Sequence, residues 1–222
     1  ESFKFLEKIP NSYHHLKRTQ NIFLQCYFDV DTTQKYLEAI IASEDYNFSR
    51  YNFFLINYLL FKKNHTAVEK IINLSEDAYN TSLLIKQASD FIQAGNSEKI
   101  TNFFSCKNPR DVIAEIFYLI SNLYSTEENY QLSNFYLKIS LFLNKKFLSN
   151  RVLLAENFYN QKKYELSKKT YHSIKTIGQV YSWYSSRRLA LILTDTTEKE
   201  QSVKYLKKEF DLLLHPNFEH YY

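Results

Sequence analysis

Histidine is the first residue type to examine for chemistry, because paired imidazoles on one helix face bind zinc. The chain has six histidines, none of which forms a His-Glu-x-x-His pair or has a cysteine at ligand spacing. We therefore expect no metal site, and we interpret the histidines as exposed or packing side chains. They are His14, His15, His65, His172, His215 and His220.

The two cysteines are the next candidates. Cys26 and Cys106 have no short spacing between them, which argues against a metal site or a disulfide framework. A single disulfide stays open as an alternative, but buried free thiols are the preferred interpretation because unpaired cysteine behaves as a small apolar residue.

Catalytic loops are also missing from the sequence. No Gly-x-Ser-x-Gly elbow occurs, and Gly95 and Gly178 stand alone, so no glycine-rich nucleotide loop can form. Acidic residues are plentiful, but no pair is marked as a general acid and base. We expect a protein that is not an enzyme and takes no cofactor.

Composition indicates helices. The chain has 222 residues with 18 Phe and 19 Tyr but two Gly and three Pro, and β-rich folds need more glycine for their turns. The net charge is +4, and its Lys-Lys blocks alternate with acids, which is typical of solvated helix faces. No apolar run approaches the about 18 residues of a membrane span, since even Phe53–Phe61 contains Asn57.

An internal repeat organises these helices. Two segments align without a gap at a spacing of 34 residues, and large, small and aromatic residues recur in nearly the same order. The first segment has Ile120, Ser121, Tyr124, Tyr130, Ser133, Leu137 and Ser140, and the second has Leu154, Ala155, Phe158, Tyr164, Ser167, Tyr171 and Ile174. In a helix hairpin, the small residues allow close approach of the two helices, while the aromatics fill the space between neighbouring hairpins.

This pattern resembles the tetratricopeptide repeat family, whose hairpins carry small and aromatic residues at these places. The family's proline is absent, since Lys145 and Gln179 stand there. The resemblance implies an all-α fold, namely a right-handed superhelical solenoid of about six antiparallel helix hairpins.

The pattern continues in both directions. Downstream it uses Leu189, Ala190, Leu193, Ser202 and Leu206; upstream it uses Ala88, Phe91, Gly95, Ile100 and Phe104, then Tyr58, Ala67, Ile71 and Leu74, and finally Leu24, Thr33, Leu37 and Ile40. We expect a lead-in helix or partial repeat in residues 1–13 and an array over 14–222, with repeats starting near 14, 48, 81, 114, 148 and 183. Pro216 should end the last helix. Residues 218–222 are interpreted as the opening of a further repeat beyond this chain.

A narrower resemblance is to long multi-repeat proteins of Gram-negative bacteria, carried by Leu154–Tyr159 and Arg187–Ala190. In that group such repeats are often exported. The resemblance implies the cell envelope, periplasm or cytoplasm of a bacterium.

The family's binding surface is the concave groove lined by first helices. Mapping the groove positions onto the three clearest repeats gives Tyr118, Asn122, Glu156, Tyr159, Asn160, Tyr184 and Arg187. Tyrosine and arginine offer large contact area and directional hydrogen bonds, so we predict a groove that binds a peptide or protein segment. Only Asn122 and Arg188 match the family's clamp for C-terminal carboxylates, which disfavours chaperone tails.

Two alternatives to a peptide-binding groove remain. An RNA-binding helical repeat needs a basic groove, but Ile56, Ile85 and Glu156 occupy mapped positions, so a nucleic-acid partner is disfavoured. The other alternative is a structural scaffold that self-associates or docks on its own chain.

Overall fold

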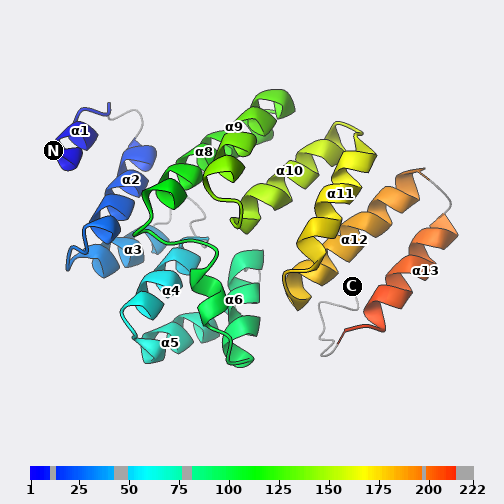
Figure 1. Cartoon of the computed structure of the whole chain (residues 1–222), viewed down its shortest axis with the longest axis horizontal. Coiled ribbons are helices and arrows are strands. Elements are labelled where there is room, and N and C mark those ends of the chain that lie inside the picture. The colour runs from blue at the N-terminus through cyan, green and yellow to red at the C-terminus, as the bar shows by residue number, and fades with distance from the viewer. Residues whose placement is uncertain (11–13, 43–49, 77–81, 197–198, 214–222) are drawn as a thin grey trace. The chain divides into compact units, whose positions relative to one another are not determined.

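The computed structural model describes residues 1–10, 14–42, 50–76, 82–196 and 199–213, and within these ranges helices joined by turns and loops are the only regular secondary structure (Figure 1). The predicted all-α class is confirmed. In chain order the helices are α1 Ser2–Glu7, α2 His14–Tyr27, α3 Thr33–Ile41, α4 Tyr51–Phe61, α5 His65–Glu76, α6 Leu83–Gln93, α7 Glu98–Thr101, α8 Pro109–Thr126, α9 Tyr130–Leu143, α10 Leu148–Asn160, α11 Tyr164–Lys175, α12 Gln179–Thr196 and α13 Lys199–Phe210.

The same turn ends five of these helices. Each of α2, α4, α6, α8 and α10 is followed by a residue with positive φ, and these residues stand 34, 32, 33 and 34 positions apart: Asp29, Lys63, Gly95, Glu128 and Lys162. In every case the N–H of the next residue donates a hydrogen bond to the carbonyl oxygen five positions earlier, as the Lys163 N–H does to the Phe158 oxygen at 2.8 Å. This left-handed cap satisfies carbonyls that the helix end leaves open.

The chain divides into two compact units. The first contains Glu1–Phe117 with Phe142–Phe147, and the second contains Tyr118–Leu141 with the chain from Leu148 onward. In the first unit α4 is apolar on nearly every side, so it is buried on most of its surface. Its Phe54 packs against Phe23 and Phe104, with ring centroids 5.1 and 4.7 Å apart.

One ion pair is buried in the first unit. Arg50 binds the Glu115 carboxylate through two nitrogens, one of them 2.7 Å from Oε2, and its guanidinium lies 5.1 Å from the ring centres of both Phe54 and Phe147. Burial raises the pKa of Glu115, and the Arg50 charge opposes this shift. Removing either member of the pair should destabilise the fold, because the other would remain as an uncompensated buried charge.

The interpretation of the cysteines as free thiols is wrong. Cys26 at the end of α2 and Cys106 in the loop before α8 form a disulfide across 80 residues, with Cα atoms 5.8 Å apart. Their spacing in the sequence does not predict the bond, because the packing of the helices, rather than the local sequence, brings the two cysteines together.

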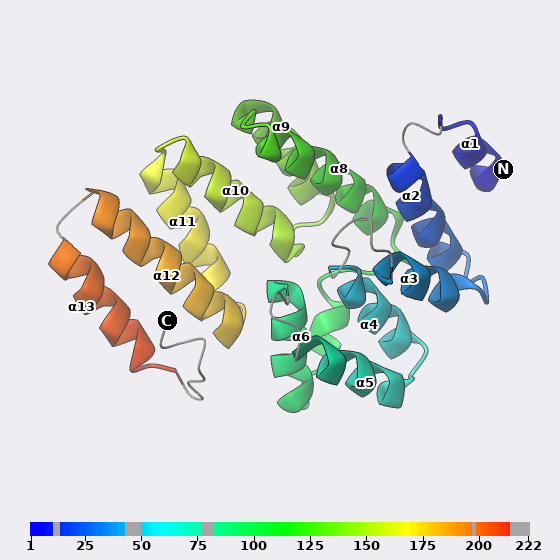
Figure 2. The ribbon, with the colours of Figure 1, turned by 180° about the vertical axis from the view of Figure 1, so that it is seen from behind.

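In the second unit the predicted small residues lie where the helices of a pair meet. Ser133 of α9 donates its hydroxyl hydrogen bond to the Ser121 carbonyl of α8 at 2.8 Å. Ser167 of α11 donates to Ala155 of α10 at 2.9 Å, and Ser202 of α13 donates to Ala190 of α12 at 2.7 Å. Helices α10 to α13 lie side by side in chain order in both views (Figures 1 and 2). The repeated sequence pattern therefore corresponds to a repeated contact.

A buried asparagine joins neighbouring pairs. Asn157 of α10 donates to Ser133 at 2.7 Å and to the Asn134 side-chain oxygen at 2.9 Å, and it accepts from Ser125 at 2.6 Å. Because a buried amide without partners is costly, this fully bonded Asn157 fixes the position of α10 against α8 and α9.

Some expectations differ from the structure. Leu74, expected to pack, is 66 % exposed. Helix α8 begins at Pro109, before the expected position 114, because the Asn108 side chain caps the Arg110 N–H at 3.1 Å and proline suits a first helical position. Helix α12 also begins early, at Gln179. The repeat starts at 48 and 81, Pro216, and residues 218–222 lie outside the described residues.

Candidate functional site

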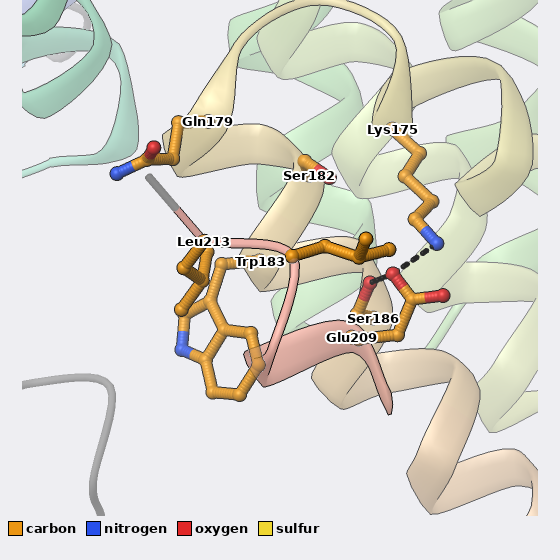
Figure 3. A pocket seen from close by; sticks show the side chains of 8 residues that line it. Lys175, Gln179, Ser182, Trp183, Ser186, Glu209 and Leu213 are labelled. Atoms are coloured by element: carbon orange, nitrogen blue, oxygen red, sulfur yellow. Dashed lines mark hydrogen bonds and ion pairs between the residues drawn. The ribbon is translucent and has the colours of Figure 1, made fainter. Parts of the chain in front are cut away.

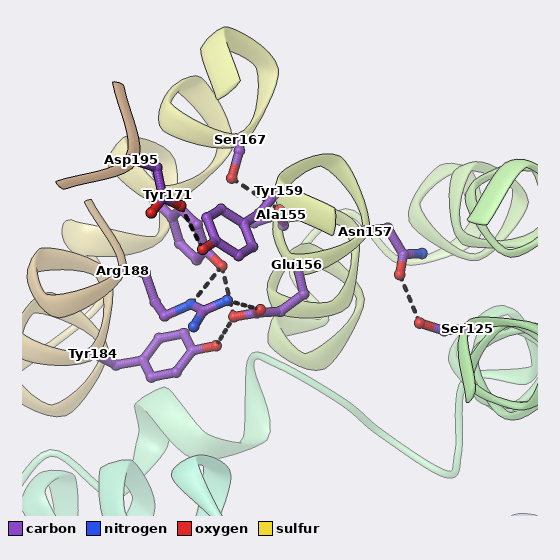
Figure 4. Close-up of polar contacts among 10 residues, drawn as sticks. All are labelled: Ser125, Ala155, Glu156, Asn157, Tyr159, Ser167, Tyr171, Tyr184, Arg188 and Asp195. Atoms are coloured by element: carbon purple, nitrogen blue, oxygen red, sulfur yellow. Dashed lines mark hydrogen bonds and ion pairs between the residues drawn. The ribbon is translucent and has the colours of Figure 1, made fainter. Parts of the chain in front are cut away.

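A cluster of polar and aromatic side chains lies where α10, α11 and α12 meet (Figure 4). Glu156 and Tyr159 come from α10, three residues apart and therefore on one helix face. Tyr184, Arg188 and Asp195 share one face of α12, and Tyr171 comes from α11. We call these six residues the Glu156 cluster.

Glu156 is the acceptor at its centre. Its Oε1 accepts hydrogen bonds from the Tyr171 hydroxyl at 2.6 Å and from the Tyr184 hydroxyl, and its Oε2 pairs with the Arg188 guanidinium. Arg188 Nε also donates to the Tyr171 oxygen at 3.2 Å. The Glu156 and Arg188 side chains are each 24 % exposed, so the ion pair is partly open to solvent.

Tyr159 extends the cluster outward. Its ring lies 4.9 Å from the Arg188 guanidinium carbon, within the range of a cation–π contact, and its hydroxyl donates to Asp195 at 2.7 Å. The hydrogen bond to Asp195, with some burial, raises the pKa of Tyr159 to about 12. Burial and the Glu156 charge also raise the pKa values of Tyr171 and Tyr184, so all three phenols stay protonated near neutral pH.

Three of the seven predicted groove residues meet here: Glu156, Tyr159 and Tyr184. Arg187 is exposed on α12 and Asn160 is exposed at the end of α10. Tyr118 is half-buried and Asn122 exposed, both on α8. Ile56 and Ile85, which also occupy mapped positions, are fully buried, so neither can contact a ligand.

The groove mapping gives Arg187, whereas Arg188, which the sequence matches only to the family's clamp for carboxylates, makes the contacts in the cluster. The mapping already allows for the one-residue longer spacing of the last pair, but it cannot resolve which of two adjacent arginines, about 100° apart around the helix, faces α10. The repeat pattern predicts only a packing role for Tyr171, and no sequence pattern marks Asp195 as a groove residue. The available signal was charge: an acid and a base 32 residues apart, on corresponding helices of neighbouring pairs.

Tyr171 is fully buried, whereas the Tyr159 ring, the Glu156–Arg188 pair and the Asp195 carboxylate lie at one partly exposed surface. Such groups suit recognition of a polar or aromatic segment. Among the described residues, no three potential metal ligands lie together, and no helix combines the length and apolarity needed to cross a membrane.

Comparison with known proteins adds no relative: no family model, no curated protein and no solved structure matches the chain.

Proposed function

We propose that this chain is a non-catalytic scaffold that binds a peptide or protein segment at the surface around the Glu156 cluster. The observation that carries the proposal is the partly exposed Glu156–Arg188 pair, framed by Tyr159 and Tyr184, on the first helices of two consecutive pairs. Tyrosine and arginine are enriched among the residues that dominate the binding energy of protein interfaces, so a partner can gain affinity at this surface.

The wider architecture in this proposal is a right-handed solenoid of tetratricopeptide-like hairpins. The five left-handed turns 32 to 34 residues apart support it, and so do the three equivalent serine–carbonyl bonds in the second unit. Stacked hairpins contact only their neighbours, which leaves an extended surface.

Small-angle X-ray scattering tests the architecture. A compact domain of 222 residues has a radius of gyration of about 17 Å. The solenoid predicts a clearly larger value for the monomer. A value at the compact limit would remove the solenoid from the proposal while leaving the cluster in place.

Peptide selection tests the binding surface. A random peptide library is displayed and selected on the immobilised protein, and recovered peptides are measured by fluorescence anisotropy. Replacing Tyr159 by Ala should weaken binding at least tenfold, because its ring lies over the partly exposed Arg188 guanidinium of the cluster. The matched control replaces exposed Lys169 and His172 of α11 by Ala and should leave affinity unchanged.

The contrary outcomes are distinct. Equal binding by both variants, with unchanged circular dichroism, would place recognition elsewhere. Retention on immobilised RNA that falls with salt would favour the RNA-binding alternative. A mass that rises with concentration in light scattering, without peptide binding, would favour a self-associating structural scaffold.

A further inference from the structure

A cavity of about 320 Å³ opens between the end of α11, the first half of α12 and the end of α13 (Figure 3). It is separate from the Glu156 cluster, because Gln179, Ser182, Trp183 and Ser186 share one face of α12. Tyr184, Arg188 and Asp195 lie about half a helical turn away. The remaining lining residues are Lys175, Glu209, Leu212 and Leu213.

One wall of the cavity is apolar and aromatic. The Trp183 side chain belongs to a residue only 8 % exposed, and its ring meets Phe210 in an edge-to-face contact with centroids 6.0 Å apart. Leu212 and Leu213 complete this wall. A flat aromatic group binds more tightly to such a wall than a flexible polar group does. Its ring buries apolar area and also makes edge-to-face or stacked contacts with the aromatic side chains.

The opposite end of the cavity is polar and ordered. Lys175 pairs with the Glu209 carboxylate, Ser186 donates to Glu209 Oε2 at 3.1 Å, and Lys175 also reaches the Tyr205 hydroxyl at 3.4 Å. The Glu209 side chain is 11 % exposed. An ionised carboxylate has about four acceptor positions, and Lys175 and Ser186 occupy two of those of Glu209, so it can accept from a further donor.

We propose that this cavity binds one phenolic ring, namely a tyrosine side chain of a partner segment. The ring lies against Trp183, and its hydroxyl donates to Glu209. Gln179 and Ser182 at the rim serve the flanking peptide groups. The volume fits, since a cavity of about 150 Å³ holds benzene and ligand pockets begin near 300 Å³.

The protein carries its own reporter for this site. Trp183 is the sole tryptophan, so no second indole contributes to the tryptophan emission or to the indole N–H resonance that report on the cavity wall. The probes are N-acetyltyrosinamide, N-acetylphenylalaninamide and N-acetylglycinamide. The tyrosine probe should give a saturable change in both signals at millimolar concentration, the phenylalanine probe should bind several-fold more weakly, and the glycine probe should give no change.

Three variants sharpen the test. Ser182→Phe fills the cavity from its rim and should abolish the saturable change. Glu209→Gln keeps the shape but weakens the acceptor, so the preference for tyrosine over phenylalanine should fall at least threefold. Glu200→Gln, at an exposed position of the same helix, is the matched control and should behave as the wild type.

The contrary results are equally definite. A linear, non-saturating response of Trp183 to all three probes would overturn the site. Saturable binding that survives Ser182→Phe, with native circular dichroism, would place the probe outside the cavity. An unchanged tyrosine preference in Glu209→Gln would overturn the assigned role of the carboxylate.

Discussion

Arg188 of α12 pairs with Glu156 of α10, and the same carboxylate accepts hydrogen bonds from Tyr171 and Tyr184. The pair connects corresponding helices of consecutive hairpins, so one contact both holds two hairpins together and forms the surface on which we expect a partner to bind. Burial opposes the charge of Arg188, but its contacts with Tyr171 and Glu156 raise its pKa, which keeps the cation in place.

Close approach of α10 and α11 depends on Ser167. Ser167→Val removes the hydrogen bond to Ala155 and adds bulk at a fully buried position, so we expect a loss of about 2 to 3 kcal/mol in the free energy of unfolding. Ser173→Val, at an exposed position of the same helix, should change it by less than about 0.5 kcal/mol, since Ser and Val have similar helix propensities. Urea unfolding measures both, and equal effects would show that the two helices do not meet at Ser167.

The left-handed turns are strained wherever a side chain is present. Lys162 has φ 57°, so Lys162→Gly should stabilise the protein by about 0.5–1 kcal/mol. The reverse change, Gly95→Ala, should cost about 1 kcal/mol from the backbone alone, because an added Cβ meets no atom within 4 Å. Lys169→Gly within α11 is the control and should destabilise by about 1 kcal/mol. A destabilising Lys162→Gly would contradict the turn geometry.

The disulfide should stabilise the first unit. Because Cys26 and Cys106 close a loop of 80 residues, reduction should cost about 2–4 kcal/mol. Denaturant unfolding followed by circular dichroism, with and without reductant, measures this loss. The Cys26→Ser/Cys106→Ser double variant should have the same free energy of unfolding as the reduced wild type, and reductant should not change it. An unchanged wild-type midpoint, with both thiols shown to be reduced, would refute a stabilising bond.

The cluster should weaken at high pH. The folded protein holds the pKa of Tyr159 at about 12, above its value near 10 in the unfolded chain, so its contribution is complete below pH 10 and is lost as pH rises toward 12. Tyrosinate absorbance of the wild type minus that of Tyr159→Phe isolates this titration. A difference curve centred near 10 would show that the bond to Asp195 does not form in solution.

Much of the second unit follows from the sequence. Ser121, Ala155 and Ala190 are small, as are Ser133, Ser167 and Ser202, and only small residues allow helix backbones to approach this closely. Because the small size of these side chains is what the helix contact requires, the contact can be predicted from a single sequence. The buried polar bonds of Asn157 depend on three partners and have no such one-residue signature.

Other features depend on geometry that spacing does not encode. Four of the left-handed turns have no glycine at the residue with positive φ, so the sequence does not predict them. These residues are Asp29, Lys63, Glu128 and Lys162. The disulfide joins the end of α2 to the loop before α8, and only the packed fold brings these two segments together. The groove mapping names Arg187, and its neighbour Arg188, which the sequence matches only to the family's clamp, makes the contacts because adjacent residues point about 100° apart around a helix.

A double-mutant cycle on Glu156 and Arg188 tests the central claim, that consecutive hairpins meet at this pair. Glu156→Gln, Arg188→Gln and the double variant are compared by urea unfolding followed through Trp183. The expected coupling is about 1–3 kcal/mol, since the pair is half-buried and shares the hydroxyls of Tyr171 and Tyr184. The exposed pair Glu165–Lys168 sets the baseline at about 0.3 kcal/mol. Additive effects at Glu156 and Arg188, within that baseline, would contradict the stacking of these two hairpins.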